Sequence, residues 1–216
     1  MKVLVSHSDN PQAEVLRSHF ADTFSRYYAG WDHDYDRRFD PQALWFSVRD
    51  QDDQLISAAR LLFPYVKGKR LLLPLEVGQG DQPVLAAKSN TVCEGAGLYF
   101  VEKEHIDDIM NALMVWCHHN QVNNFYALVD AGYTALLEKY EGMEMRIVDG
   151  WIARFADITS RKRGTAVAWQ PLVMDRKGLE KIWLENHRRY QFQIDPGAEA
   201  VLASLGFGEH QTGRDW

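Results

Sequence analysis

Residues 39–64 read FDPQALWFSVRDQDDQLISAARLLFP, and this stretch decides the fold. Residues 43–50 and 55–63 are rich in β-branched and large apolar side chains, as β-strands are. The four polar residues 51–54 separate the two runs and predict a turn. The stretch therefore predicts a β-hairpin that follows an acidic turn and carries Arg60 in its second strand.

The segments on either side of the hairpin predict alternating strands and helices. Asn10 before Pro11 predicts a helix start, because Asn caps a first turn and Pro fits its first position. That helix ends near Gly30, and irregular loops are expected at 31–42 and 75–90. We expect strands at 2–6, 69–73, 91–101, 124–130, 143–148 and 165–173, and helices at 106–117, 131–140 and 176–192.

The composition indicates one domain. The chain has 216 residues, of which 46% are hydrophobic, and this is enough for one sizeable core. We expect residues 1–175 to form the main domain, with 176–216 as a helical extension and tail of that same domain. The formal net charge of −6 offers no basic footprint for nucleic acid, so no nucleic-acid partner is expected.

The sequence contains no pattern typical of export or of a membrane span. The apolar stretch at the N-terminus is too short for a signal peptide, and no run approaches the ~20 apolar residues of a spanning helix. Cys93 and Cys117 have neither metal nor redox spacing, and their apolar surroundings predict buried, reduced thiols. We therefore expect a cytoplasmic protein without a metal site.

Carboxylates and aromatic rings alternate between residues 31 and 40. Carboxylates balance the charge of a cationic ligand, and aromatic faces attract a sulfonium or an ammonium. A solvated acidic turn is the alternative interpretation of this pattern. The residues concerned are Trp31, Asp32, Asp34, Tyr35, Asp36, Phe39 and Asp40.

Two charged residues stand in apolar strands. Burying the charge of Arg60 without a partner is costly, so we expect an ion pair with the acidic loop, a contact with a substrate carboxylate, or both. Desolvation raises the pKa of a carboxylate such as Glu94, which suits it to accept a proton from an attacking amine. An ion pair of Glu94 with Arg60 or Lys88 is the structural alternative.

These motifs resemble those of the acyl-homoserine-lactone synthases, which have the GNAT acyltransferase fold. In that family an acidic motif ending in Tyr/Phe-Asp precedes two strands and an Arg-Leu-Leu-Pro, and here Asp40 and Arg60 match its last Asp and its Arg. Glu94 matches the Glu of the family segment Glu-x-Ser-Arg-Phe, but Ala96 and Gly97 replace the Ser and the Arg. The resemblance extends over about residues 16–173.

The resemblance implies an α/β (α+β) fold with a mixed, mostly antiparallel central sheet flanked by helices. Two neighbouring central strands splay apart in this fold, and the thioester arm lies between them. Here these strands are expected at 91–101 and 124–130. Glycine inside a strand often marks a bulge or a close backbone approach, which suits Gly95 and Gly97 to this place.

The resemblance also implies roles for individual residues. Glu94 is the expected general base. Asp34 and Asp36 match the acidic motif only with a one-residue insertion, because Arg37 occupies the family position. The expected acceptor-binding residues are Trp31, Asp34, Asp36, Asp40 and Arg60, and the expected thioester cleft is lined by Gly95, Ala96, Gly97 and Leu98.

The implied function is transfer of an acyl chain from acyl carrier protein or coenzyme A to the amine of S-adenosylmethionine. The product would be an N-acyl-homoserine lactone, a quorum-sensing autoinducer. Both substrates are small molecules apart from a possible acyl carrier protein, and no permanently bound cofactor is expected. The missing Ser-Arg pair leaves two alternatives open: a GNAT enzyme that acylates another amino acid or small amine from acyl-CoA, and a GNAT-shaped ligand-binding protein without turnover.

Overall fold

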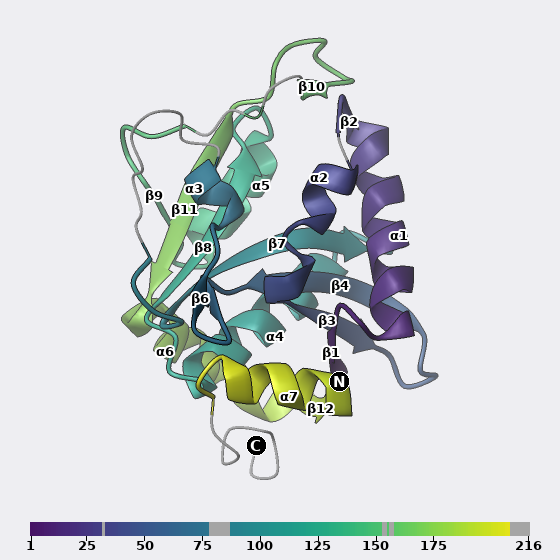
Figure 1. Cartoon of the computed structure of the whole chain (residues 1–216). Coiled ribbons are helices and arrows are strands. Elements are labelled where there is room, and N and C mark those ends of the chain that lie inside the picture. The colour runs from purple at the N-terminus through teal and green to yellow at the C-terminus, as the bar shows by residue number, and fades with distance from the viewer. Residues whose placement is uncertain (32, 78–86, 153–154, 156–157, 208–216) are drawn as a thin grey trace.

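A computed structural model describes residues 1–31, 33–77, 87–152, 155 and 158–207, with an eight-stranded sheet at its centre (Figure 1). Neighbouring strands run antiparallel, except that β1 pairs with β12 and β7 with β8 in parallel. In spatial order the strands are β12 (Gln191–Ile194), β1 (Lys2–His7), β3 (Ala43–Arg49), β4 (Leu55–Leu62), β7 (Val92–Phe100), β8 (Asn124–Asp130), β11 (Trp169–Asp175) and β9 (Arg146–Ile147). Asp32, residues 78–86 of the expected long loop and residues 208–216 of the tail lie outside the described residues.

Helices cover both faces of this sheet. Because side chains alternate along a strand, Leu44 and Phe46 of β3 face α4, whereas Trp45 packs against Leu16 and Phe20 of α1. The helices are α1 (Pro11–Tyr27), α2 (His33–Arg37), α3 (Pro74–Val77), α4 (His105–His119), α5 (Thr134–Gly142), α6 (Arg176–Asn186) and α7 (Pro196–Ser204), with 3-10 turns η1 (Asp40–Gln42) and η2 (His187–Arg189). Two short ladders pair β2 (Tyr28–Ala29) with β10 (Thr159–Ser160) and β5 (Tyr65–Val66) with β6 (Lys69–Arg70).

The local signals in the sequence predicted the first helix and the hairpin correctly. The Asn10 Oδ1 atom accepts a hydrogen bond of 2.7 Å from the Gln12 amide, and Pro11 is the first residue of α1. β3 and β4 form the expected hairpin, in which Trp45 lies opposite Arg60. This pairing brings the charged residue of β4 under α1.

β7 and β8 separate as expected for the central strands. They pair only from Val92 with Asn124 to Gly95 with Ala127, and then diverge (Figure 1). On its other side β7 carries a bulge, because Ala58 and Arg60 of β4 lie opposite Tyr99 and Ala96. Gly97 lies inside the bulge with φ of +65°, a conformation that glycine adopts without strain.

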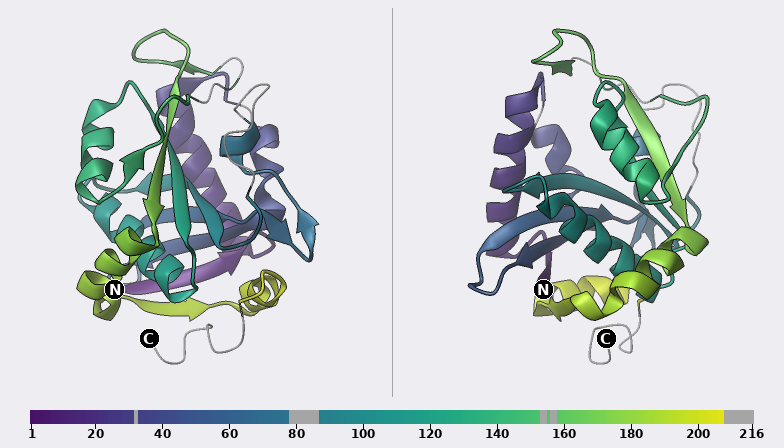
Figure 2. Two further views of the ribbon diagram at one scale, coloured as in Figure 1. Left: turned by 90° about the vertical axis from the view of Figure 1, so that its left-hand side faces the viewer. Right: turned by 180° about the vertical axis from the view of Figure 1, so that it is seen from behind.

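The C-terminal region differs from the prediction. The expected helix over 176–192 ends at Asn186, and Gln191–Ile194 instead forms β12, parallel to β1 at the edge of the sheet (Figure 2). The backbone of β12 pairs with the edge of β1 that would otherwise be open, and the alternation of side chains along β12 buries Phe192.

Other boundaries also shift. The strands expected at 69–73 and 143–148 are reduced to two residues each, the strand expected at 165–173 lies at Trp169–Asp175, and the irregular loop at 31–42 contains α2 and η1. Cys93 and Cys117 are buried free thiols, as predicted. In the described part of the chain, no helix is long and apolar enough to cross a membrane.

The close contact between Gly95 and Phe125 gives a test of the splayed strands. A Cβ atom at Gly95 would lie 2.6 Å from the Phe125 Cζ atom, and this ring is fully buried. We expect Gly95→Ala to lower the free energy of unfolding by ~1–3 kcal/mol, as overpacking does, in urea denaturation. Gly142→Ala is the control, because no atom lies within 4 Å of the added methyl group. Equal stability of the two variants would contradict the packing described.

Candidate active site

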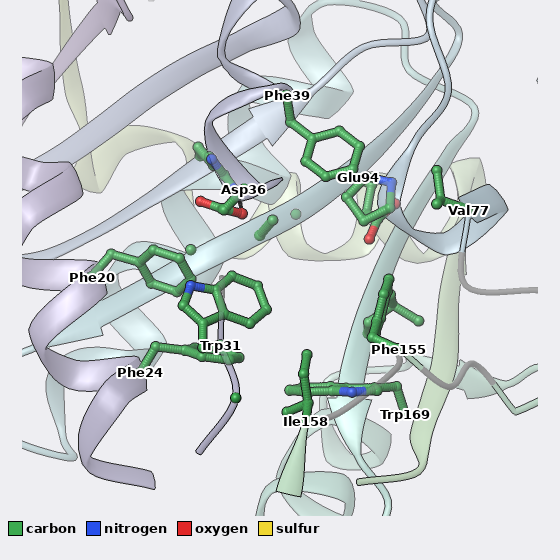
Figure 3. A pocket seen from close by; sticks show the side chains of 17 residues that line it. Phe20, Phe24, Trp31, Asp36, Phe39, Val77, Glu94, Phe155, Ile158 and Trp169 are labelled. Carbon is green, nitrogen blue, oxygen red and sulfur yellow. Dashed lines mark hydrogen bonds and ion pairs between the residues drawn. The ribbon is translucent and has the colours of Figure 1, made fainter. Parts of the chain in front are cut away.

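A cavity of about 380 Å³ opens beside the bulge of β7. Three charged residues line it: Asp36 from α2, Arg60 from β4 and Glu94 from β7 (Figure 3). Glu94 lies at one end, beside the short helix that carries Val77, and Trp169 lies at the other. The aromatic walls are Phe20, Phe24, Trp31, Phe39, Phe155 and Trp169.

Arg60 is buried and paired with the acidic loop, as predicted. Its Nη2 atom donates to the Asp36 Oδ1 atom, and its Nη1 atom lies 3.5 Å from the Asp40 Oδ1 atom. The guanidinium carbon lies 5.6 Å from the ring centre of Phe20 and 5.4 Å from that of Trp45. The charge of Arg60 is thus balanced by two carboxylates and enclosed by two aromatic faces.

A second arginine, which the sequence did not predict for the site, completes this network. The Nη2 atom of Arg17 on α1 lies 2.9 Å from the Asp40 Oδ2 atom, and its Nη1 atom donates to Glu14. Burial raises the pKa of Asp40 and the charge of Asp36 adds to this, whereas Arg17 and Arg60 lower it. Asp40 therefore links Arg17 of α1 to Arg60 of β4.

Glu94 has a different environment. It is 1% exposed, and its Oε2 atom accepts a hydrogen bond of 3.0 Å from the Leu75 amide. Burial is the main reason that the pKa of Glu94 is raised to about 8; the charge of Glu76 also raises it, whereas the Leu75 amide and Arg60 lower it. A carboxylate with this pKa can exchange a proton with an amine near neutral pH.

Glu94 also differs from the other buried acids. In the described residues, four other acidic side chains are buried, and each has a basic partner within 4.0 Å: Asp36, Glu76, Asp108 and Asp130. No described residue forms such a pair with Glu94. The ion pair with Arg60 or Lys88 that was the structural alternative is therefore not observed.

A second cavity, of about 360 Å³, adjoins the first where β7 and β8 separate. The two share the wall formed by residues 95–97 and Leu128. The second cavity continues to the opposite face of the sheet, between α4 and α5, where its lining includes Met110, Leu113 and Tyr140. It offers an apolar space that meets the first cavity at Gly95, the residue after Glu94.

The structure brings most of the expected site residues together. Trp31, Asp36, Arg60, Glu94, Gly95, Ala96 and Gly97 line the first cavity, and Leu98 lines the second only. Asp34 is exposed, and Asp40 lies behind Arg60; neither lines either cavity. No group of three potential metal ligands is present among the described residues.

Several wall residues carry no local signal for the site. Phe155, Ile158 and Trp169 reach it from a segment far along the chain, and Phe20 is distinguished in the sequence only by the helical spacing of its neighbours. The helical period places Phe20 on the buried face of α1 but does not indicate a cavity there. These residues become neighbours only when α1 and β11 pack on either side of the splayed strands.

No protein-family model and no curated protein matches the chain in sequence. Among solved structures, the CoA-dependent acyl-homoserine lactone synthase BjaI with SAM and isopentyl-CoA is similar at a TM-score of 0.56, with 12% identity over 94% of this chain and 97% of that chain. FeeM, an N-acyl amino acid synthase from uncultured soil microbes, has a TM-score of 0.54 and 10% identity over 79% and 94% of the chains. Spermidine N-acetyltransferase from Vibrio cholerae has a TM-score of 0.54 and 9% identity over 82% and 98%.

At these identities the similarity establishes the fold. The chain has the fold of the GCN5-related N-acetyltransferases, an example of which from Kribbella flavida is also similar to it. The expected GNAT-like architecture is confirmed, and the expected resemblance to acyl-homoserine-lactone synthases holds at the level of structure.

The network around Arg60 gives a stability test. Removing one partner of a buried ion pair leaves an uncompensated charge, so Arg60→Ala should lower the free energy of unfolding by ~3–5 kcal/mol. Arg37→Ala is the control: its pair with Glu14 is exposed, and such pairs contribute about 0–1 kcal/mol. Urea denaturation measures both. If Arg60→Ala instead matched the wild type in stability, the pair would have no structural role and Arg60 would serve only as a ligand contact.

Proposed function

We propose that this protein is an N-acyltransferase that moves an acyl group from a thioester to the amine of S-adenosylmethionine, giving an N-acyl-homoserine lactone. The thioester is carried by acyl carrier protein or coenzyme A. The observation that carries the proposal is the position of Glu94. This acid has no ion pair among the described residues, lines the aromatic cavity and directly precedes Gly95, where that cavity meets the apolar one.

In the proposed reaction the acyl chain occupies the second cavity and the acceptor occupies the first. Glu94 takes a proton from the acceptor amine, whose nitrogen then attacks the thioester carbonyl. The C–S bond breaks, and the thiolate leaves with the second proton that the acylated nitrogen loses. The carboxylate of the acylated S-adenosylmethionine then displaces methylthioadenosine from the carbon next to the sulfonium and closes the lactone. The ordinary pKa of an α-amino group, about 7.7–8.0, lies close to the pKa of about 8 of Glu94, so the proton moves between well-matched groups. Backbone N–H groups at the bulge of β7 are the proposed stabilisers of the oxyanion.

Two features of the first cavity support a charged acceptor. The rings of Trp31 and Trp169 offer faces to a sulfonium or an ammonium, and Asp36 contributes negative charge. The Nε atom of Arg60 is buried without a hydrogen-bond acceptor among the described residues, so it can donate to an acceptor carboxylate. The structure of BjaI was solved with SAM, which agrees with this choice of acceptor.

A second candidate is acylation of another amino acid or of a small amine. The first cavity is walled mostly by aromatic and aliphatic side chains, which suits an acceptor with an apolar side chain. Ala96 and Gly97 replace the Ser and Arg expected in a homoserine-lactone synthase. FeeM, which has a similar structure, is an N-acyl amino acid synthase.

An assay with alternative acceptors separates these functions. We expect a series of acyl-CoA and acyl carrier protein thioesters to release thiol when S-adenosylmethionine is added, with methylthioadenosine formed in equal amount. Thiol release and mass spectrometry of the products measure this. Release with phenylalanine or tyrosine but without methylthioadenosine would support the second candidate. If no acceptor accelerated thiol release, both transferase functions would be wrong and a ligand-binding protein would remain.

Glu94→Gln tests the base directly. It keeps the shape of the side chain and removes proton acceptance, so kcat should fall ~10²–10⁴-fold. The ionised form of Glu94 is the active one, so Glu94 should contribute an acid limb near pH 8 to the wild-type kcat/KM profile. The variant should lose this contribution and keep only the ionisation of the acceptor amine itself.

Stability measurements separate a catalytic role from a structural one. A pKa raised in the folded state means that wild-type stability falls as the pH rises from about 4.5 to about 8, so Glu94→Gln should be at least as stable as the wild type at pH 8. Glu144→Gln, at the exposed pair with Lys181, should keep wild-type kinetics. An unfolded Glu94→Gln variant would show a structural role, and a fully active one would place the base elsewhere.

A further inference from the structure

Glu76 is a second buried carboxylate close to the site, and it does not line either cavity. Its side chain is 3% exposed and accepts three hydrogen bonds. The Leu73 amide donates to its Oε2 atom at 2.7 Å, the Ala87 amide to its Oε1 atom at 3.3 Å, and the Arg70 Nη2 atom to Oε1. Glu76 thus joins the chain before α3 to the chain that leads into β7.

Arg70 forms an ion pair with Glu76 and lies on the side of Glu76 that faces the surface. Its side chain is 29% exposed and belongs to β6, and its guanidinium carbon lies 5.5 Å from the ring centre of Tyr65. Its Nη1 atom also donates to the carbonyl oxygen of Leu71. Two contacts besides Glu76 therefore fix this guanidinium.

The turn that Glu76 closes presents one amide to Glu94. The amides of Glu76 and Val77 both donate to the Leu73 carbonyl, at 2.9 and 3.2 Å, and the amide of Leu75, which precedes them in the turn, donates to the Glu94 Oε2 atom at 3.0 Å. No described residue donates a hydrogen bond to the Oε1 atom. One oxygen of Glu94 is held by the turn and the other remains for a proton.

We propose that Glu76 and Arg70 are positioning residues for Glu94: they hold the Leu75 amide on one oxygen of its carboxylate and set the charge beside it. This proposal rests on the proposed role of Glu94 as base in the acyltransferase. Neither residue touches the substrates in this proposal; both act through the turn over Leu73–Val77 and through their charges.

Charged and titratable groups face Glu94 from each element packed around it. These are Arg60 from β4, Glu76 from α3, Asp36 from α2 across the cavity, and Tyr126, which lies opposite Glu94 on β8. The charge of Glu76 raises the pKa of Glu94 and that of Arg60 lowers it. Removing the charge of Glu76 should therefore lower the pKa of Glu94, and removing that of Arg70 should raise it, because Glu76 is then uncompensated.

Glu76→Gln and Arg70→Gln in the full chain test this, because both break the same ion pair and the expected shifts have opposite signs. In ¹³C NMR of protein labelled at the glutamate carboxyl carbon, we expect the pKa of Glu94 to move by on the order of 0.5–1 unit down in Glu76→Gln and up in Arg70→Gln. The carboxyl resonance of Glu94 is assigned as the one that disappears in Glu94→Gln. The acid limb of the kcat/KM profile should shift in the same direction as the pKa of Glu94.

Two further variants control the experiment. Arg70→Lys keeps the positive charge and should restore a titration close to that of the wild type. Lys181→Gln breaks the exposed pair with Glu144 and should leave the titration of Glu94 unchanged. If Glu76→Gln does not fold, the comparison of Arg70→Gln with Arg70→Lys, at a half-buried position, carries the test.

Shifts in the same direction, or no shift, would overturn the proposal, because loss of the ion pair alone would then explain both variants. Equal behaviour of Arg70→Lys and Arg70→Gln would also overturn it. The NMR titration does not depend on turnover, so it can succeed even if the proposed function is wrong. If the wild type shows no acyl transfer but the pKa of Glu94 shifts in opposite directions in the two variants, the positioning role stands and the acyltransferase function does not.

Discussion

The burial of the Arg60 guanidinium is the constraint on which the site depends. This charge sits in a strand of alanine and leucine under α1, and an unpaired charge there would cost several kcal/mol. The segment before β3 meets this requirement with Asp36 and Asp40, and Arg17 of α1 then balances Asp40. The ion pairs fix α2 against the sheet, and the residues that flank it become walls of the first cavity.

The separation of β7 and β8 places the carboxylates of Asp36 and Glu94 in different surroundings. Asp36 is bound to Arg60 and stays on the charged side of the first cavity, whereas Glu94 is held by one backbone amide at the point where the strands part. Different surroundings let one site hold both a carboxylate engaged in an ion pair and a second carboxylate suited to the proposed role of proton acceptor. The splayed strands supply this difference because they remove Glu94 from water without giving it a cation.

Local signals in the sequence correctly predicted those structural features that depend only on residues close together in the chain. The cap at Asn10, the hairpin and the glycines of the bulge all follow from residue types at short spacing. β12 was missed because its strand pairing depends on the open edge of β1, at the other end of the chain. Asp34 was expected in the site, and α2 instead turns it to solvent, since a helix separates side chains that a loop could align.

The sequence predicted that Glu94 is desolvated, but it left open whether a cation pairs with it. Ion pairs formed elsewhere in the molecule answer that second question. A glutamate in an apolar strand predicts desolvation, but whether a cation neutralises it depends on the whole fold. Arg17, Arg60, Arg70, Arg163 and Arg189 each bond to an acidic side chain. With these cations engaged elsewhere, the Glu94 carboxylate keeps its raised pKa, and the tertiary structure rather than the strand sequence suits it to the proposed role of proton acceptor.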